Sequence, residues 1–412
     1  MSEKWTGRIA VCCIIGIIGI LVAAGLPDRK ESDSSEGRIA EESTVLAQSG
    51  SDDGKSETTD AQGGAEGQTQ ESENFVTVQR TNLYYYNALN EEEKTVYGQI
   101  CESILSREDT VLETVDETIV DKVFQCVMND HPDIYYCAAY KIEKQLRNNQ
   151  VVRITFMPNY HMTAEEVQEN QKKVDSYVQQ CIAGAPGTSG QYEKVKYVYE
   201  YIIRNTEYVP NSVNNQNICS VFIGRQSVCQ GYAKAAQYIL SQMGIEITLA
   251  YGSVDGELHS WNLVCVDGEY YYMDPTWGDA GYVRPGSEMT AAAGPEDVNY
   301  EYFLITTQQL TKTHVINNIV PLPACVATRN NYYVREGLYF TSYDETMLKM
   351  LFEQAEAGGN NSISFMCADA VLYQEMKDRL ITGQEVFSYM KNAESVSYSY
   401  NDGLYTLIFW IE

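Results

Sequence analysis

The strongest constraint on the fold of this chain is the dipeptide Asp267-Gly268, which stands between two stretches of alternating polarity. This dipeptide is typical of a two-residue hairpin turn. We therefore expect residues 258–266 and 269–274 to be antiparallel strands joined by that turn. The register of a hairpin fixes which of its side chains share a face, so this short segment can be interpreted residue by residue.

The expected register brings a histidine and a carboxylate together. Pairing Val266 with Glu269 places Trp261 opposite Asp274. Because alternate residues of a strand share a face, His259 is then a diagonal neighbour of Asp274, at a backbone separation of about 7–8 Å. Their side chains can meet in a hydrogen bond. A four-residue turn preserves this arrangement and a three-residue turn destroys it. The ordinary alternatives are a packed core histidine and a turn aspartate before a proline, and both stay open.

A cysteine occupies the first turn of the helix expected upstream of this hairpin. Apolar residues recur there at helical spacing, namely Tyr232, Ala236, Ile239 and Met243. Ser227 is a suitable N-cap and Gly244 a suitable stop. The free N–H groups and the helix dipole at this end favour an anion, and the thiolate of Cys229 is one. The alternative is a small buried apolar residue, which is the commonest role of cysteine.

Taken together, these three residues form a set of nucleophile, base and orienting group. Cys229 is the candidate nucleophile, His259 the candidate base and Asp274 the candidate orienter. A metal site is the competing interpretation. It would need a fourth ligand, and no spaced cysteine pair lies nearby, so we expect no metal.

Three linked motifs resemble the transglutaminase-like superfamily, in particular its bacterial branch. They span residues 227–233, 258–262 and 272–277, and their order and spacing fit that family. The resemblance implies an α+β fold with a papain-like transglutaminase core, in which a helix bearing cysteine packs on an antiparallel sheet. It implies the same roles for Cys229, His259 and Asp274. The residue after the histidine, Ser260, is a mild departure from the family pattern.

The resemblance implies an enzyme that acts on amide bonds of protein or peptide substrates through a thioester, without a metal or an organic cofactor. The product depends on whether water or an amine releases the thioester, and hydrolysis is favoured because it needs one cleft. One oxyanion donor is expected to be the N–H of Cys229, and the other lies upstream, in the neighbourhood of Gln216. Two alternatives stay open: a non-catalytic binding or scaffold module at the cell surface, and a purely structural surface protein.

The N-terminus indicates export. Residues 9–26 form an uncharged run of 18 apolar or glycine residues, preceded by Lys4 and Arg8. We expect residues 1–27 to be a retained signal anchor or a cleaved signal peptide, so that the rest of the chain is extracytoplasmic, anchored to the membrane or secreted. Residues 28–74 carry 13 acidic and 4 basic residues, lack aromatic residues and are expected to be a disordered acidic linker.

Three folded regions are expected after the linker. They are an N-terminal α+β accessory region at 75–186, a transglutaminase-like catalytic domain at 187–336 and a small C-terminal α/β domain at 337–412. The first boundary is placed at a cluster of Gly, Ala, Pro and Ser at 183–190. Helices are expected at 91–105, 118–128, 163–181, 192–205, 346–357 and 370–380, a strand at 151–157, and a hairpin at 396–411 that turns at 401–403.

The composition excludes some partners. The formal net charge of −28 argues against nucleic acid, because phosphate binding needs clustered Lys and Arg. The chain has 11 cysteines, and most of those outside the apolar run are expected to be reduced core residues. We expect a monomer.

Overall fold

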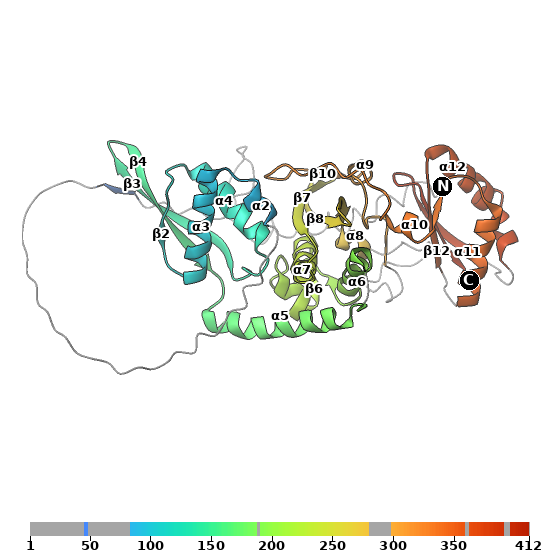
Figure 1. Ribbon diagram of the computed structural model, residues 1–412, viewed down its shortest axis with the longest axis horizontal. Helices are drawn as coiled ribbons and strands as arrows, with labels where there is room; N and C mark the ends of the chain where they lie inside the picture. Colours follow the sequence, from blue (N-terminus) through green and yellow to red (C-terminus); the bar gives the residue numbers. More distant parts are fainter. Residues whose placement is uncertain are drawn as a thin grey trace, which may run out of the picture.

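The computed structural model describes residues 45–47, 83–187, 190–279, 298–358, 362–390 and 396–411. The fold is α+β, and three regions follow one another along the long axis of the molecule (Figure 1). The expected signal segment 1–27 lies outside the described residues, as does the linker 28–74 apart from the short strand β1 (Val45–Ala47). In the described part of the chain, no helix is long and apolar enough to cross a bilayer.

The N-terminal region packs helices against one face of a sheet with strand order β1-β3-β4-β2. Its elements are α2 (Tyr84–Asn87), α3 (Glu91–Ser106), β2 (Thr110–Val111), α4 (Glu117–Asp130), β3 (Cys137–Arg147) and β4 (Gln150–Tyr160). A capping box between Asn90 and Glu93 starts α3, which explains the accurate prediction of that helix. Strand β3 is missing from the sequence analysis, because most of its side chains are half-exposed on both faces and give no clear alternation.

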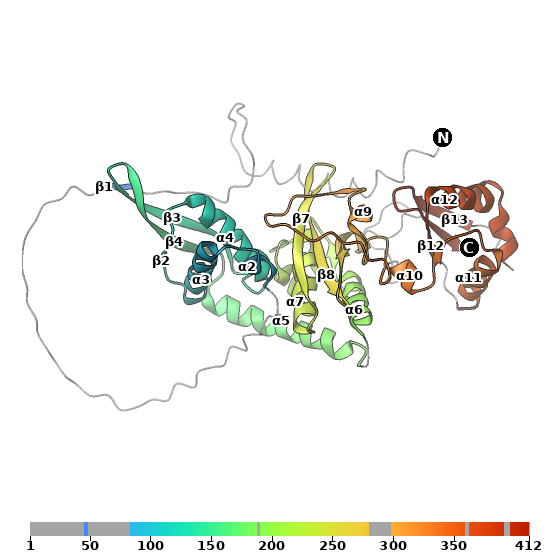
Figure 2. The same ribbon diagram turned by 45° about the horizontal axis from the view of Figure 1, so that its top comes forward.

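Helix α5 (Ala164–Gly184) connects the N-terminal region to the middle one and runs along one edge of the molecule (Figure 2). It begins at a capping box between Thr163 and Glu166. Val174, Val178 and Cys181 of its second half pack in the same hydrophobic core as the middle region. The second half of α5 therefore belongs to the core of the middle region, although the boundary between the two regions is expected from the sequence after it, at residue 186.

The middle region is built on an antiparallel sheet with strand order β10-β7-β8-β9. The strands are β7 (Ile247–Val254), β8 (Glu257–Val266), β9 (Glu269–Met273) and β10 (His314–Ile316), and β5 (Glu207–Tyr208) pairs separately with β6 (Gln226–Ser227). The helices are α6 (Gln191–Arg204), the π-helix η1 (Ser220–Gly224), α7 (Cys229–Gln242), α8 (Pro275–Asp279), α9 (Thr307–Leu310) and α10 (Tyr332–Arg335).

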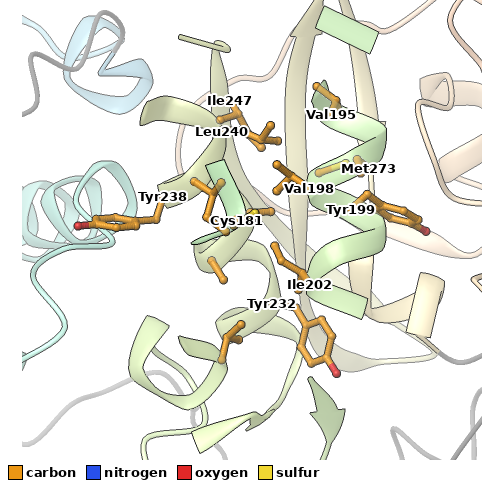
Figure 3. Close-up of a cluster of buried hydrophobic side chains, with 14 of the residues drawn as sticks. Cys181, Val195, Val198, Tyr199, Ile202, Tyr232, Tyr238, Leu240, Ile247 and Met273 are labelled. Atoms are coloured by element: carbon orange, nitrogen blue, oxygen red, sulfur yellow. The ribbon is translucent and has the colours of Figure 1, made fainter. Parts of the chain in front are cut away.

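The core of the middle region lies between α6, α7 and the sheet (Figure 3). Val198 and Ile202 of α6 and Leu240 of α7 are among its fully buried members. Burying a side chain of this size contributes about 1.5–3 kcal/mol. The core therefore holds the first turn of α7 in a fixed position relative to β8 and β9.

The C-terminal region has a sheet of order β11-β12-β14-β13. Its elements are β11 (Tyr339–Phe340), α11 (Glu345–Gly358), β12 (Ser362–Cys367), α12 (Ala370–Met376), the π-helix η2 (Lys377–Thr382), the 3-10 helix η3 (Glu385–Tyr389), β13 (Val396–Asn401) and β14 (Thr406–Ile411). Asn401 pairs with Thr406, so the turn spans residues 402–405 and the turn predicted at 401–403 is wrong. Both paired residues also donate hydrogen bonds to the buried Glu301, which docks this region on the middle one.

Candidate active site

The nucleophile candidate, Cys229, is the first residue of α7 and is partly exposed. Its backbone N–H belongs to the helix turn whose N–H groups have no intrahelical acceptor. The N-cap is Val228, which has an extended backbone and no side-chain cap, so the prediction of Ser227 as N-cap is wrong. The Ser227 hydroxyl instead contacts Ser220, the first residue of η1, and the carbonyl of Asn215 in the segment before η1. Sequence spacing cannot place either residue beside α7.

The hairpin has the predicted register. Val266 pairs with Glu269, and positive φ values of 53° at Asp267 and 81° at Gly268 form the two-residue turn. His259 and Asp274 meet as this register requires: the His259 Nε2 lies 2.6 Å from the Asp274 Oδ2, and both side chains are buried. The hairpin therefore presents an imidazole with its Nε2 held by a carboxylate.

The third candidate residue joins this pair. The Cys229 sulfur lies within hydrogen-bonding reach of the His259 ring. Because the Nε2 of that ring is bonded to Asp274, the Nδ1 is the atom left to exchange a proton with sulfur. Asn262 fixes the distance between helix and hairpin, since its side-chain amide on β8 donates to the carbonyl of Ala233 in α7 at 2.9 Å.

Asp274 uses both carboxylate oxygens. Its Oδ1 accepts the backbone N–H groups of Thr276 at 2.9 Å and Trp277 at 3.2 Å, which caps the short helix α8. Its Oδ2 faces His259 and a second histidine, His314, whose Nε2 lies at 3.2 Å. The capping role and the site role of this aspartate are therefore compatible, because each occupies a different oxygen.

His314 is a site residue that the sequence analysis missed. It lies on β10 and is fully buried, and its ring is surrounded by Trp261, Trp277 and Tyr302. Its Nδ1 contacts the Thr313 hydroxyl at 2.7 Å, so the Nε2 carries the proton that bonds to Asp274. The indole N–H groups of Trp261 and Trp277 are buried and have no hydrogen-bond acceptor among the described residues.

The electrostatics of the three buried groups are strongly coupled. Burial alone would lower the pKa of His259, but the Asp274 carboxylate and the Cys229 sulfur outweigh it and raise this pKa to about 10. Burial alone would raise the pKa of Asp274, but His259 and then His314 hold it below its usual range. Burial lowers the pKa of His314 despite the nearby carboxylate. At neutral pH, Asp274 is therefore an anion, His259 a cation and His314 a neutral donor.

The same histidines and aspartate are the candidate metal ligands in the described part of the chain. Two ligand atoms of a tetrahedral zinc lie about 3.4 Å apart when each is about 2.1 Å from the metal. The separation of 2.6 Å between the His259 Nε2 and the Asp274 Oδ2 is too short for this arrangement and is typical of a charge-assisted hydrogen bond. We therefore interpret the cluster as a hydrogen-bond network.

Part of the chain matches a known protein family. Residues 175–275 match the sequence profile of the transglutaminase-like superfamily. This part of the chain is transglutaminase-like. The match includes the second half of α5 and ends just after Asp274, so it contains all three candidate residues. No curated protein sequence matches the chain.

Several solved structures are similar to part of this chain. One is a TGase, with 14% identity over 38% of this chain and 54% of its own and a TM-score of 0.25. Another is a proposed cysteine protease from Cytophaga hutchinsonii, with 14% identity over 34% and 62% of the two chains and a TM-score of 0.23. The periplasmic domain of TgpA from Pseudomonas aeruginosa has 13% identity over 31% and 55% and a TM-score of 0.20. The aligned part is less than two thirds of each solved chain.

Two oxyanion donors are expected from the sequence at or near the start of α7. The N–H of Cys229 is free of intrahelical partners, as expected from its place in α7. Gln216 is exposed and follows Asn215, whose carbonyl accepts the N–H of Val228 at 3.2 Å. The loop that carries Gln216 therefore lies against the start of α7, where a second donor would be needed.

Replacing His314 by leucine tests its role as a positioning residue in the transglutaminase-like region. The substitution removes one of the two histidine N–H groups on Asp274, and a buried hydrogen bond contributes about 1 kcal/mol, so we expect turnover to fall about 5- to 10-fold. The remaining carboxylate charge then acts on His259 alone, and the pH at which this ring loses its proton should stay at or above its original value. The pH dependence of Cys229 alkylation measures that transition, and a downward shift would contradict the assigned hydrogen bond. Thr313→Val keeps the His314 ring but removes the hydroxyl that contacts its Nδ1, so a smaller loss of turnover is expected there than in His314→Leu.

Proposed function

We propose that the chain is an extracytoplasmic cysteine enzyme that performs acyl transfer or hydrolysis at amide bonds of protein or peptide substrates. The observation that carries the proposal is the hydrogen bond of 2.6 Å between the Nε2 of His259 and the Oδ2 of Asp274. The same His259 ring also lies within hydrogen-bonding reach of Cys229. A thiol, a base and an orienting carboxylate are what nucleophilic catalysis through a thioester requires. The expected export of the chain rests on its N-terminal sequence.

In the first half of the reaction, the proton shared by Cys229 and His259 resides on the Nδ1 of His259, in keeping with the cationic His259 ring at neutral pH. The thiolate attacks the amide carbonyl carbon, and the carbonyl oxygen becomes an oxyanion that the Cys229 N–H stabilises. The amide C–N bond then breaks as the His259 imidazolium gives its proton to the departing amine or ammonia. Asp274 keeps the ring oriented and balances its positive charge throughout.

In the second half, a nucleophile releases the thioester. His259 takes a proton from water or from a primary amine, which attacks the thioester carbonyl, and the Cys229 thiolate leaves while the proton stays on the His259 ring. Water gives a carboxylic acid and an amine gives a new amide bond. We favour hydrolysis, because it needs one binding cleft, whereas cross-linking needs a second one for the amine.

The location and the partners that we propose for the enzyme rest on the net charge of the chain and on its N-terminal apolar run. The net charge of −28 disfavours nucleic acid as a partner, and protein or peptide is the substrate class that the chemistry requires. We propose that the enzyme is a monomer that is anchored by its N-terminal segment or secreted, and that it works without a metal or an organic cofactor.

Alkylation of the full chain with iodoacetamide at pH 7 tests the first half of the reaction. We expect Cys229 to react at least about 10-fold faster than Cys265, a partly exposed thiol with no imidazole partner among the described residues, because a thiolate is the reactive form. His259→Ala should remove the difference. Peptide mass spectrometry assigns the label to each cysteine. Equal reaction of Cys229 in the two proteins would mean that the imidazole does not activate the thiol.

Incubation with unfolded casein tests the second half and separates the two products. New amino termini or released ammonia indicate hydrolysis, and incorporation of a fluorescent primary amine indicates cross-linking. Cys229→Ala is the control, because it removes the nucleophile and keeps the fold. Binding of casein without either product, in a protein whose Cys229 also reacts as an ordinary thiol, would favour the non-catalytic binding module.

A further inference from the structure

A second cysteine lies beside a histidine in the N-terminal region, away from the candidate active site. The Sγ of Cys101 on α3 is 3.9 Å from the Nε2 of His131, and the Nδ1 of the same ring is 3.6 Å from a carboxylate oxygen of Asp133. The order of groups is thiol, imidazole and carboxylate, as at the candidate active site. These residues take no part in the proposed acyl transfer.

His131 ends a helix and lies between the thiol and the carboxylate. It is the C-cap of α4, and its N–H bonds to the carbonyl of Val127 at 3.0 Å. An imidazole in contact with a thiol can accept the thiol proton, and the resulting imidazolium then lies beside the thiolate on one side and the Asp133 carboxylate on the other.

Cys101 differs in its surroundings from the other thiols of the described residues. Burial raises the pKa of the six buried cysteines, which are Cys126, Cys137, Cys181, Cys219, Cys325 and Cys367. Cys265 is partly exposed, but burial and the carboxylate of Glu246 raise its pKa. Cys101 is also partly exposed, and 20% of the His131 side chain and 41% of the Asp133 side chain are accessible to solvent. A small reagent can therefore reach a thiol that has a partner for its proton.

The local backbone argues against acyl transfer at Cys101. This residue lies in the interior of α3, which starts at Glu91 and ends at Ser106, so its N–H is used within the helix. Cys229 begins its helix and has a free N–H for an oxyanion. The second constellation thus has the groups that activate a thiol and lacks the donor that would stabilise a tetrahedral intermediate.

We infer that Cys101, His131 and Asp133 form a peroxide-reactive thiol site. The Cys101 thiolate attacks one oxygen of a hydroperoxide, an S–O bond forms and the O–O bond breaks. The His131 imidazolium gives its proton to the departing hydroxide or alkoxide, which leaves as water or an alcohol. The sulfur is oxidised by two electrons to the sulfenic acid and the peroxide is reduced, so the reaction balances with the hydroperoxide as the only co-reactant.

The test uses hydrogen peroxide and the full chain at pH 7. A 1,3-diketone such as dimedone traps the sulfenic acid, and peptide mass spectrometry measures the trapped fraction at each cysteine. We expect trapping at Cys101 at least about 10-fold faster than at Cys265, which is the internal control because it is partly exposed and has no imidazole partner among the described residues. His131→Asn should reduce the rate at Cys101 to that of Cys265, and Asp133→Asn should reduce it less.

Two outcomes would overturn the inference: equal trapping at Cys101 and Cys265, or a rate at Cys101 that His131→Asn leaves unchanged. His259→Ala separates this site from the proposed active site, since it should abolish the activation of Cys229 and leave Cys101 as it was. An unchanged rate at Cys265 and an unchanged circular dichroism spectrum in His131→Asn exclude misfolding as the cause of a loss. The reactivity of Cys101 can therefore be tested separately from the proposed acyl transfer at Cys229.

Discussion

Replacing Asp274 by asparagine should reduce turnover by up to about 10⁴-fold, the loss seen when the orienting aspartate of a catalytic triad is replaced by asparagine. The reason lies in the use of both carboxylate oxygens. The Oδ1 accepts the N–H groups of Thr276 and Trp277, and the Oδ2 accepts from His259 and His314. An asparagine has one oxygen, so it can serve either the backbone or the histidines.

Either orientation of the new amide damages the site. If its oxygen faces the histidines, its NH₂ group meets two backbone N–H donors and the cap of α8 is lost. If its oxygen faces the backbone, its NH₂ group meets the Nε2 of His259, which must then accept, so that the proton moves to the Nδ1. A neutral ring protonated at the Nδ1 cannot take the proton of Cys229. We also expect a loss of about 1–3 kcal/mol in the free energy of unfolding, because one buried donor is left unsatisfied.

The pH dependence of Cys229 alkylation tests this prediction more directly than turnover does. The pKa of His259 is raised to about 10 in the folded protein, above the ordinary value of about 6.5. The ion pair therefore stabilises the fold fully below the ordinary value and loses that effect as the pH rises through about 10. In Asp274→Asn, the upper pH transition of Cys229 alkylation should move down towards 6.5, opposite in sign to any shift in His314→Leu. A transition that stays near 10 would show that Asp274 does not hold the charge of His259.

The parts of the site that could be predicted from the sequence are those fixed by local rules. The type of turn at Asp267-Gly268 and the alternation of faces along β8 and β9 determine that His259 and Asp274 meet. Helical spacing and a stop at Gly244 likewise place Cys229 in the first turn of α7, although the helix begins one residue later than the expected N-cap at Ser227 would require. None of these inferences needs a contact between distant segments.

The parts that were missed depend on such contacts. His314 joins the site because β10 pairs with β7, and its own neighbourhood in the sequence gives no sign of that pairing. The hydroxyl of Ser227 is hydrogen-bonded to Ser220 of η1 and to the carbonyl of Asn215 in the segment before it, and both lie against the start of α7. Recognising His314 from sequence would have required the position of a three-residue strand, which is too short to show alternation.

Replacing Gly252 by alanine should be the most destabilising small substitution near the site. Gly252 pairs with His259 on one side and with Ile316 of β10 on the other. A Cβ atom at this position would lie 1.9 Å from the carbonyl oxygen of Val315 and 2.8 Å from the N of Asn317. Both are backbone atoms, so no side-chain rotation relieves the overlap and β10 must move away from β7.

The expected result is a loss of about 3 kcal/mol in the free energy of unfolding, at the upper end of the range typical of overpacking, because the overlap is with backbone atoms. Urea unfolding followed by circular dichroism measures it. Gly98→Ala is the matched control, since a Cβ there meets no atom within 4 Å and alanine is favoured over glycine in a helix by about 1 kcal/mol. Equal midpoints for Gly252→Ala and the unsubstituted protein would mean that β10 does not approach β7 this closely. If the variant folds, displacement of β10 should also move His314 away from Asp274, so that its alkylation profile resembles that of His314→Leu.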